Sequence, residues 1–453
     1  MNALNIMVTK PEQAVYTLVV GLGKTGLSAV RYLRAIGEPV IVVDSRDVPP
    51  GLSVLKNEYR DVELHTGAFD VSLFTGAHRI IVSPGVAMVE PALVAARKNN
   101  IEIIGDIDLF SHEVNAPVIG ITGSNGKSTV TTLLALMASQ AGLKSVASGN
   151  IGIPVLDSLD SEVALYVLEL SSFQLETLQH LPMKAAVVLN ISADHLDRYE
   201  SMASYAMSKQ AIYQNAEIMV LNKDDEVASQ VNGLSGKQIR FTLAEPGEGE
   251  FGLCQDESAI SSLCFGRQKL VAVADLQLKG KHNMQNALAA LALGYAAGLP
   301  FDAMITALKE FRGLPHRTQL VARIDDVNWI NDSKATNVGA AIAAMLGLPG
   351  KHVLIAGGMG KGADFSDLTA VVKQHCRAVI LMGEDADRIQ SVMPESVIVK
   401  QVADMQSAVL AAKELALPGD NVLLAPACAS FDMFDNFEHR GDVFLQSVQV
   451  LRS

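Results

Sequence analysis

The run of residues best suited to chemistry is Gly123-Ser124-Asn125-Gly126-Lys127-Ser128, which lies between an apolar stretch and a helix-like one. At such a strand–turn–helix junction, successive backbone N–H groups and the positive end of the helix can surround a phosphate group. Lys127 would add a full charge, and the Ser128 hydroxyl could bind Mg²⁺. Gly120 stands one residue too far upstream for the usual G-x-x-x-x-G-K-S spacing. We therefore predict an imperfect phosphate-binding loop, the alternative being an incidental glycine turn with a surface lysine.

A second glycine-rich turn, Gly21–Gly26, has the spacing G-x-G-x-x-G, and Asp44 ends the next apolar run. Taken alone, this pattern indicates NAD binding. The same geometry could hold the pyrophosphate of another nucleotide, with Asp44, Ser45 and Arg46 near its ribose or base. A tight turn required only for packing is the remaining alternative.

Acidic residues follow two later apolar runs. Glu169 follows residues 164–168, and Asp194, His195 and Asp197 follow residues 185–190. Because the carboxyl ends of parallel strands meet at one edge of a sheet, Glu169 is placed to bind Mg²⁺ beside the phosphate-binding loop. An exposed glutamate and a structural histidine are the alternatives, and Lys209 by itself would be taken for a solvated lysine.

Short apolar runs alternate with helical stretches along most of the chain, which predicts an α/β protein with parallel, doubly wound sheets. At 453 residues the chain exceeds one hydrophobic core, so about two to four domains are expected. Residues 240–278 are expected to form an antiparallel flap, and residues 281–311 to be helical with a break at 298–300. The predicted strands are 17–20, 39–44, 79–82, 116–122, 164–170, 185–190, 327–331, 352–356, 378–382, 397–400 and 421–425.

Composition excludes several classes of protein. The net charge of −13 argues against a dedicated nucleic-acid or membrane-surface binder, which would carry a basic stripe. No run of about 18 uncharged apolar residues predicts a membrane span, and the N-terminus does not read as a signal peptide. The four cysteines at 254, 264, 376 and 428 show no metal-type or pairing pattern, so free thiols in a reducing compartment are expected.

Seven short motifs occur in order along the chain, together with the two glycine-containing turns of the N-terminal region. They are T-G-S-N-G-K-S-T, L-E-L-S-S-F-Q-L-E, N-I-S-A-D-H-L-D-R-Y, K-H-N-M-Q-N-A-L-A-A, G-L-P-H-R, N-D-S-K-A-T-N and A-P-A-C-A-S-F-D-M-F. Each is unspecific alone. The ordered set covers essentially the whole chain and resembles the Mur ligases, most of all the members that add D-glutamate.

The resemblance implies three domains. A Rossmann-like domain at residues 1–105 would bind the UDP end of a precursor. A P-loop ATPase-like domain with a mostly parallel sheet, residues 106–313, would bind ATP. A Rossmann-like domain at residues 314–453 would receive the amino acid and close over both, with helical joints near 312–316 as hinges.

The implied activity is ATP-dependent amide ligation, in which D-glutamate is joined to UDP-N-acetylmuramoyl-L-alanine through an acyl phosphate during peptidoglycan synthesis. These two substrates are the expected partners of a cytoplasmic monomer that binds no nucleic acid and inserts into no membrane. The D configuration of the amino acid rests on the resemblance alone.

The family's chemistry also implies roles at matching positions. Lys127 would hold the β- and γ-phosphates of ATP, while Ser128 and Glu169 would bind one Mg²⁺ and His195 a second. The family lysine matching Lys209 is carbamylated by CO₂, which turns a cation into an anion able to bind the second Mg²⁺. Lys127, Glu169, His195 and Lys209 form the implied catalytic set. The implied ATP-binding residues are Gly123, Ser124, Asn125, Gly126, Lys127, Ser128, Thr129, Asn283, Asn286, Arg317 and Asp332.

Two further sets follow from the same resemblance. Glutamate has two carboxylates, and Lys361, in the glycine-rich turn 357–362, is a natural partner for the side-chain one. The implied D-glutamate-binding residues are Lys334, Thr336, Lys361, Ser430, Phe431 and Phe437, the first two after the first strand of the C-terminal domain. The implied UDP-precursor-binding residues are Lys24, Thr25, Ser45, Arg46, Gly85, Asn150 and His195.

Three other functions stay open on the sequence. An NAD-dependent dehydrogenase would use the turn at 21–26 but leaves the phosphate-binding loop unexplained. A sibling Mur or folylpolyglutamate-type ligase would take another acceptor. A nucleotide-sensing or scaffold protein would bind ATP without substrate-dependent turnover.

Overall fold

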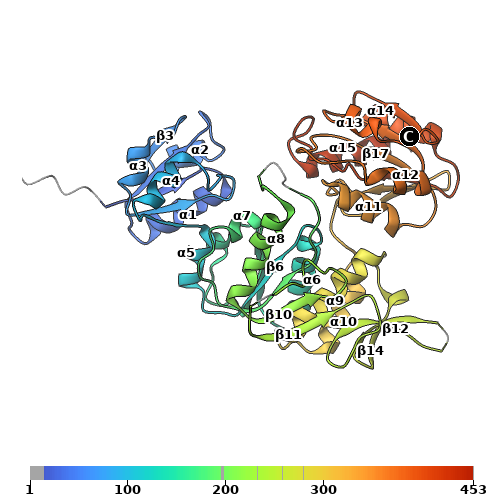
Figure 1. The fold of residues 1–453 in the computed structure, drawn as a ribbon, viewed down its shortest axis with the longest axis horizontal. Helices are drawn as coiled ribbons and strands as arrows, with labels where there is room; N and C mark the ends of the chain where they lie inside the picture. The colour runs from blue at the N-terminus through green and yellow to red at the C-terminus, as the bar shows by residue number, and fades with distance from the viewer. Residues whose placement is uncertain (1–14, 195–197, 232, 258, 279, 452–453) are drawn as a thin grey trace, which may run out of the picture. The chain divides into compact units, whose positions relative to one another are not determined.

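The computed structural model describes residues 15–194, 198–231, 233–257, 259–278 and 280–451. Three β-sheets, each flanked by helices, follow one another along these residues (Figure 1). The chain divides into two compact units. One comprises the described residues up to Ala116 with Ser148–Val163 and Leu170–Pro182. The other comprises Pro117–Ala147, Ala164–Glu169 and the described residues from Met183 onward.

The sheet of the first unit is parallel and has the strand order β3-β2-β1-β4-β5. The order reverses between β1 and β4, so a crevice is expected beyond their carboxyl ends. Leu18 and Val20 of β1 face one hydrophobic core, which also takes side chains of α3 and α4. The elements of this unit are β1 (Thr17–Val20), α1 (Lys24–Ala35), β2 (Val40–Asp44), α2 (Leu52–Glu58), β3 (Glu63–Thr66), α3 (Val71–Thr75), β4 (Arg79–Val82), α4 (Pro91–Lys98), β5 (Glu102–Ile104), α5 (Asp106–Glu113), η1 (Val155–Ser158) and α7 (Ser172–Leu175).

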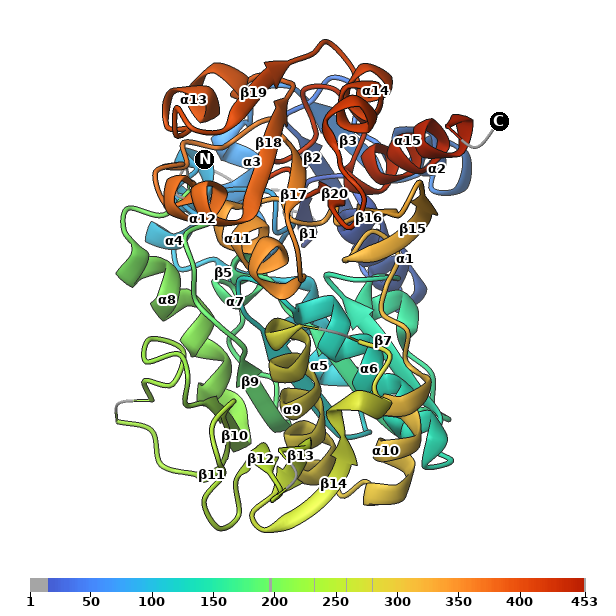
Figure 2. The ribbon, with the colours of Figure 1, turned by 90° about the vertical axis from the view of Figure 1, so that its right-hand side faces the viewer.

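The central sheet has the order β14-β13-β12-β11-β10-β9-β6-β8-β7, with β6 paired in parallel to both β8 and β9. Helix α9 packs across β9, β10 and β11, while α10 lies against α6 (Figure 2). The elements are β6 (Val118–Thr122), α6 (Lys127–Gln140), β7 (Ser145–Gly149), β8 (Leu165–Glu169), β9 (Met183–Val188), α8 (Met202–Gln210), η2 (Ala211–Asn215), β10 (Ala216–Asn222), β11 (Lys237–Phe241), β12 (Phe251–Gln255), β13 (Ser261–Phe265), β14 (Gln268–Ala272), η3 (Val273–Asp275), α9 (Lys281–Ala296) and α10 (Phe301–Glu310).

The third sheet has the order β15-β16-β20-β17-β18-β19, and only its first pair is antiparallel. Alternate residues of β17 face two separate cores, Leu354 toward α11 and α12 and Val353 toward α14 and α15. Helices on both faces explain why these strands are continuous apolar runs. The elements are β15 (Gln319–Ile324), β16 (Val327–Asn331), α11 (Val338–Gly347), β17 (His352–Ala356), α12 (Leu368–His375), β18 (Cys376–Leu381), α13 (Ala386–Ser391), β19 (Ile398–Gln401), α14 (Met405–Leu415), β20 (Asn421–Leu424) and α15 (Phe437–Val450).

Two local expectations about the third sheet are wrong. Residues 312–316 form no helix but an irregular connection between α10 and β15. Lys334 and Thr336 follow β16, the second strand of this sheet, because β15 and β16 form an antiparallel hairpin that the sequence pattern did not reveal.

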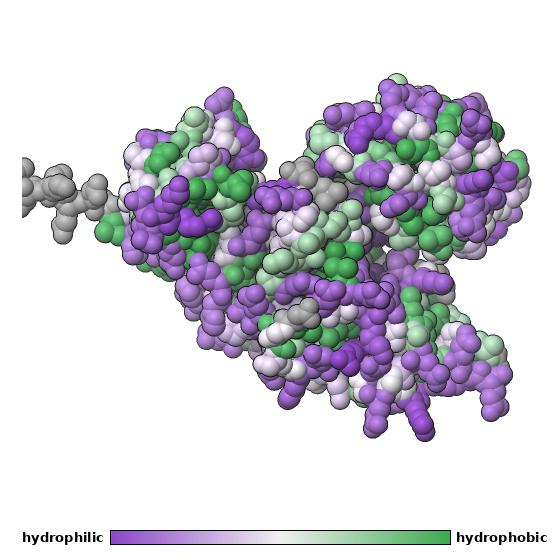
Figure 3. All heavy atoms as spheres, in the orientation of Figure 1, coloured by the Kyte–Doolittle hydropathy of each residue, from purple (hydrophilic) through white to green (hydrophobic). Residues whose placement is uncertain are grey.

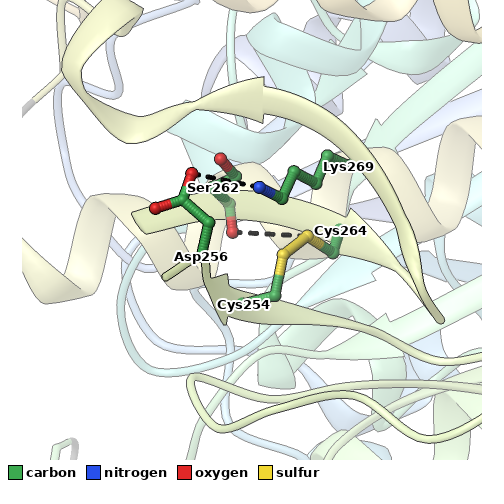
Figure 4. The surroundings of a disulfide bond; sticks show 5 residues. All are labelled: Cys254, Asp256, Ser262, Cys264 and Lys269. Carbon is green, nitrogen blue, oxygen red and sulfur yellow. Dashed lines mark hydrogen bonds and ion pairs between the residues drawn. A yellow bond between two sulfur atoms is a disulfide. The ribbon is translucent and has the colours of Figure 1, made fainter. Parts of the chain in front are cut away.

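The flap at residues 240–278 contains the antiparallel strands β12, β13 and β14. Cys254 and Cys264 form a disulfide between β12 and β13, and Lys269 pairs with Asp256 beside it at 3.1 Å (Figure 4). Cys376 and Cys428 are buried free thiols. The expectation of free thiols is therefore wrong for the first pair, which lies ten residues apart on strands that the sequence did not resolve.

Candidate functional site

The loop between β6 and α6, here called the phosphate loop (Gly123–Ser128), depends on two glycines with positive φ. Gly123 has a φ of 146° and Gly126 a φ of 88°, a region that L side chains rarely enter. A Cβ on Gly126 would overlap Oδ1 of Asn286 on α9. Any other residue at position 126 would therefore strain the backbone and push the Asn286 amide away from the loop.

Residues that follow β9 and a tyrosine of α8 fix the shape of the phosphate loop. Asn190 accepts a hydrogen bond from the Asn125 N–H at 2.8 Å and donates one to the Asn125 carbonyl at 3.0 Å. The Ser124 hydroxyl donates to the Ser192 carbonyl at 3.0 Å and lies 3.2 Å from the Tyr205 hydroxyl. Asn190 and Tyr205 were not predicted. The position of Asn190 at the end of a parallel strand was the available signal.

Two lysines share one backbone acceptor in the loop. The ammonium of Lys127 donates to the carbonyl of Gly123 at 2.7 Å, and the ammonium of Lys209 donates to the same oxygen at 3.0 Å. Lys209 is buried on α8 and lies over the ring of Tyr205. Burial and the charge of Lys127 hold the pKa of Lys209 well below its ordinary value.

Glu169 is the carboxylate that interacts electrostatically with both of these lysines. It ends β8 beside Ile121 of β6 and is buried. Burial lowers the pKa of Lys127, and Glu169 opposes that shift. Burial also lowers the pKa of Arg317 and takes the pKa of Lys334 to about 8, again with Glu169 opposing. Lys127, Lys209, Arg317 and Lys334 therefore all lie within electrostatic reach of this one carboxylate.

Arg317 reaches the loop from the connection before β15. Its guanidinium donates a hydrogen bond of 2.9 Å to the Ser128 hydroxyl. Nearby, Thr318 donates to the carboxylate of Asp332 at 3.4 Å. Burial raises the pKa of Asp332 to about 6, although Arg317 lowers it.

A cavity of about 90 Å³ adjoins the loop and is called the central cavity. Both asparagines of the i,i+3 pair on α9 face it, as the helical spacing predicts. The predicted nucleotide-binding residues that line it are Asn125, Gly126, Thr129, Asn283, Asn286, Arg317 and Asp332, and Lys334 lines it as well.

The side-chain chemistry of the residues predicted to bind Mg²⁺ decides whether they suit this ion. The Ser128 hydroxyl and the Glu169 carboxylate are oxygen donors of the kind Mg²⁺ prefers, and both are buried at the loop. Over the described ranges, no group of three His, Cys, Asp or Glu side chains could hold a metal ion by itself. The donors thus fit an ion that takes its remaining ligands from phosphate oxygens and water. His195 lies outside the described residues.

A second cavity, the N-terminal cavity, has a volume of about 480 Å³ and lies at the carboxyl ends of β1, β2 and β4. It collects all the described residues predicted for a UDP-linked precursor, with Gln174 as an addition. Those lining residues are Lys24, Thr25, Ser45, Arg46, Gly85 and Asn150.

Asp44, the acidic residue of the dinucleotide-like fingerprint, is already engaged. Its carboxylate accepts a hydrogen bond from the Leu22 N–H at 2.7 Å and pairs with the Arg46 guanidinium at 2.6 Å. Although burial raises the pKa of Asp44, these bonds outweigh it and the net shift is downward. An acid held this way is poorly disposed to bind the ribose of NAD, which weakens the dehydrogenase alternative.

A third cavity, the C-terminal cavity, measures about 170 Å³ and contains Thr336 and Lys361 among its lining residues. The ammonium of Lys334 lies 3.9 Å above the centre of the Phe437 ring. Ser430 is buried and Phe431 is 66% exposed. Neither lines the C-terminal cavity, so the six residues predicted for glutamate are only partly brought together.

Each of the three sheets lies in a region of the chain that matches a known protein family. The N-terminal domain of Mur ligase MurD-like proteins matches residues 15–105, the Mur ligase middle domain matches 121–294, and the Mur ligase glutamate ligase domain matches 316–428. The chain belongs to the Mur ligase family.

Curated relatives of this Mur ligase align over nearly their whole length. A UDP-N-acetylmuramoylalanine–D-glutamate ligase of Nitrosococcus oceani is 51% identical, with 98% of each chain covered. A ligase of the same name from Pseudomonas aeruginosa is 49% identical over 96% of this chain and 98% of its own.

Solved structures support the three-domain α/β fold of this Mur ligase. A MurF ligase of Thermotoga maritima in complex with ADP superposes with a TM-score of 0.63 at 17% identity, covering 98% of this chain and 100% of its own. The UDP-N-acetylmuramate–alanine ligase MurC of the same organism gives 0.60 at 18% identity, covering 96% and 98%. The expected family and fold class, with two Rossmann-like domains around a central mostly parallel sheet, are confirmed.

Hydrophilic and hydrophobic residues are mixed on one face of this Mur ligase (Figure 3). On the face shown in Figure 3, hydrophilic residues predominate and hydrophobic ones are scattered among them. Among the described helices, none combines the length and apolar character needed to cross a bilayer.

One structural residue near the predicted glutamate positions of this Mur ligase was missed by the sequence. Arg440 on α15 is almost fully buried and donates hydrogen bonds to the carbonyls of Ser333 and Cys428 at 2.8 and 3.1 Å. It thereby ties together the segments that carry Lys334 and Ser430. No local pattern distinguishes this arginine from a surface residue of an amphipathic helix.

Proposed function

We propose that this Mur ligase joins D-glutamate to UDP-N-acetylmuramoyl-L-alanine at the expense of ATP, through an acyl phosphate, in the synthesis of peptidoglycan precursors. The names of relatives about half identical over nearly the whole chain support this assignment. The observation that carries the proposal is the gathering of Lys127, Arg317 and Lys334 around Glu169 beside the phosphate loop. Such a cationic, water-poor site suits a reaction between two anions.

ATP would bind with its phosphates at the phosphate loop and its adenosine in the central cavity. Lys127 would turn from the carbonyls of Gly123 and Ser124, which it now contacts at 2.7 and 3.0 Å, toward the β- and γ-phosphates. Asn283 and Asn286 would lie near the adenine, and Asp332 near the ribose.

Ser128 and Glu169 would hold a Mg²⁺ ion, with Lys209, as a carbamate formed from CO₂, and His195 assigned to a second ion. When bound, Mg²⁺ offsets the charge that accumulates on the transferred phosphoryl group. Arg317 would then exchange its bond to the Ser128 hydroxyl for one to the nucleotide.

In the first step, a carboxylate oxygen of the alanyl group attacks the γ-phosphorus of ATP, and ADP leaves. The chain's task is positional and electrostatic: Lys127 and Arg317 lower the repulsion between the attacking carboxylate and the triphosphate. In the second step, the neutral amine of D-glutamate attacks the acyl carbon, the C–O bond to phosphate breaks, and an amide forms as the nitrogen releases one proton; phosphate leaves with the shared oxygen. Because an acyl phosphate is hydrolysed when water reaches it, closure of the C-terminal domain would protect it.

Three substrate regions follow from this assignment. The N-terminal cavity would bind the UDP end of the precursor, with Asn150 near its muramoyl portion. The C-terminal cavity would bind D-glutamate through Lys361 and Thr336, completed by Lys334, Ser430, Phe431 and Phe437. We place domain boundaries at 1–105, 106–313 and 314–453, and infer that a single chain in the cytoplasm forms all three regions.

Phosphate release tests the proposal. The protein is incubated with ATP, Mg²⁺ and UDP-N-acetylmuramoyl-L-alanine, and each of D-glutamate, L-glutamate, L-alanine, L-lysine and meso-diaminopimelate is added in turn. Release with D-glutamate alone, abolished in Lys127→Ala, is expected. Release with another amino acid would keep the ligase chemistry and overturn the acceptor, whereas no release with any would overturn the proposal.

A further inference from the structure

Asp385 stands at the N-cap position of α13, yet within the described residues its side chain makes no capping bond to that helix. An aspartate at this position usually accepts a hydrogen bond from an N–H of the first turn. Asp404 does so at the start of α14, where it accepts from the Ser407 N–H at 2.7 Å. Oδ2 of Asp385 instead accepts a hydrogen bond of 2.6 Å from the N–H of Gly360. The carboxylate thus serves a loop 25 residues earlier in the chain.

That loop, Gly357–Gly362, is here called the glutamate loop, and its backbone is unusual. Lys361 has a φ of 51°, in the left-handed region that lysine rarely enters. Such a conformation persists only where the surroundings impose it. A Cβ on Gly360 would come within 2.9 Å of the Asp385 carboxylate and 2.7 Å of the Phe365 ring. The carboxylate is therefore packed directly against the backbone that precedes Lys361.

Arg388 connects Asp385 to a second point of the backbone near the glutamate loop. Its guanidinium donates to Oδ1 of Asp385 at 2.7 Å and to the carbonyl of Ala363 at 2.8 Å. Asp385 and Arg388 therefore contact the backbone on both sides of Lys361. Because Asp385 is buried and both its oxygens are engaged, its orientation is fixed by the fold.

The segment that follows β20 also holds the glutamate loop. Met359 and Ala429 exchange two backbone hydrogen bonds, of 3.0 and 2.9 Å, next to Ser430. With the backbone fixed at Met359 and at Gly360, Lys361 is the cation that the loop contributes to the C-terminal cavity.

We propose that Asp385 is a positioning residue for amino-acid binding: it holds the glutamate loop in the conformation that presents Lys361 to a carboxylate of the incoming amino acid. This inference rests on the proposed function, in which that amino acid is D-glutamate. It assigns Asp385 no contact with substrate. Its effect passes through the N–H of Gly360.

The test compares Asp385→Ala and Asp385→Asn with Asp404→Ala, which removes an N-cap aspartate from a neighbouring helix of the same sheet. We expect the KM for D-glutamate to rise about 10- to 100-fold in Asp385→Ala, the loss typical of one hydrogen bond to a charged group. Asp385→Asn keeps an acceptor oxygen but loses the charge, so a smaller rise is expected. The KM values for ATP and for the UDP-linked precursor should stay within about twofold.

Trapping of the acyl phosphate with hydroxylamine, without amino acid, gives a readout that precedes amino-acid binding. It should be unchanged in both Asp385 variants, and Asp404→Ala should match the wild type in every kinetic constant. A D-glutamate KM within about twofold of wild type in folded Asp385→Ala would overturn the inference. If thermal unfolding shows that this variant does not fold, an unchanged KM for D-glutamate in folded Asp385→Asn would overturn the inference. Failure of the wild type to use D-glutamate would instead refute the proposed function.

Discussion

Burial governs the charged residues around the phosphate loop. Lys127, which is partly buried, and Lys209, which is buried, donate to one carbonyl oxygen at 2.7 and 3.0 Å. Two full ammonium charges so close together repel one another strongly in a low-dielectric site. The arrangement therefore favours a neutral amine on one of them; the pKa values of both are lowered by burial, and that of Lys209 more strongly.

A neutral Lys209 amine can add CO₂ to give a carbamate, with release of one proton. We predict that ¹³C-bicarbonate gives a carbamate resonance in the NMR spectrum of the wild-type protein and none in Lys209→Arg. Lys184→Arg is the matched control, because the Lys184 side chain, on β9, is much more exposed than that of Lys209 and is paired with Glu217. A resonance that survives in Lys209→Arg would show that another amine carries the group.

Asp332 gives a prediction about pH and stability. Burial raises its pKa from 3.8 to about 6 in the folded protein. As pH rises from about 4 to about 6, the unfolded chain loses this proton before the folded one does, so this group's contribution to stability falls and stays low above about pH 6. Without nucleotide, Asp332→Asn should therefore be more stable than wild type by about 1–3 kcal/mol near pH 8, with no gain near pH 4. Urea unfolding of both proteins from about pH 4 to about pH 8 measures this difference in stability. An equal gain in stability at the two pH values would refute the explanation.

At the scale of elements, Gly23 at the N-cap of α1 and Gly26 in its first turn are under different constraints. A Cβ on Gly26 would overlap the carbonyl of Gly21, whereas a Cβ on Gly23 would meet nothing within 4 Å. Gly23 also has a φ of −90°, which alanine adopts readily. Gly26→Ala should destabilise the first unit by at least about 1–3 kcal/mol, and Gly23→Ala should unfold like wild type. Equal stability of the two variants in thermal denaturation would contradict this structure of the turn.

The same elements show why some strands could be predicted from the sequence and others could not. Thr17–Val20, Arg79–Val82 and His352–Ala356 are interior strands buried on both faces, and the continuous apolar runs identify each of them with its observed bounds. Glu63–Thr66 lies at a sheet edge with mostly exposed side chains, so its sequence lacks that signal. The strands missed are β3, β5, β7, β10, β11 and β15, of which β10 is an interior, mostly buried strand that this signal should have identified.

The residues of the site also differ in whether a local sequence pattern could predict them. The phosphate loop and Glu169 could be predicted because a turn motif and a strand end are local patterns. The ties of Asn190 to Asn125, of Asp385 to Gly360 and of Arg440 to Ser333 join residues 65, 25 and 107 positions apart. They depend on how the chain folds back, so no local pattern distinguishes them.

For the whole molecule, function requires that separate cavities serve one reaction. The N-terminal cavity takes Asn150 and Gln174 from segments far along the chain, which belong to the first compact unit. The central and C-terminal cavities both draw on the residues that follow β16, among them Lys334 and Thr336. The short segment between them therefore links the nucleotide-binding and amino-acid-binding regions of the proposed ligase.

Isotope transfer tests the proposed ligation most directly. UDP-N-acetylmuramoyl-L-alanine with ¹⁸O at both oxygens of its alanyl carboxylate is incubated with ATP, Mg²⁺, D-glutamate and the protein. The masses of the released phosphate and of the peptide product are then measured by mass spectrometry. The acyl-phosphate route predicts one ¹⁸O in each released phosphate and a peptide product that has gained one glutamyl residue and retained the other ¹⁸O. Unlabelled phosphate, or a product without the glutamyl residue, would contradict the proposed function.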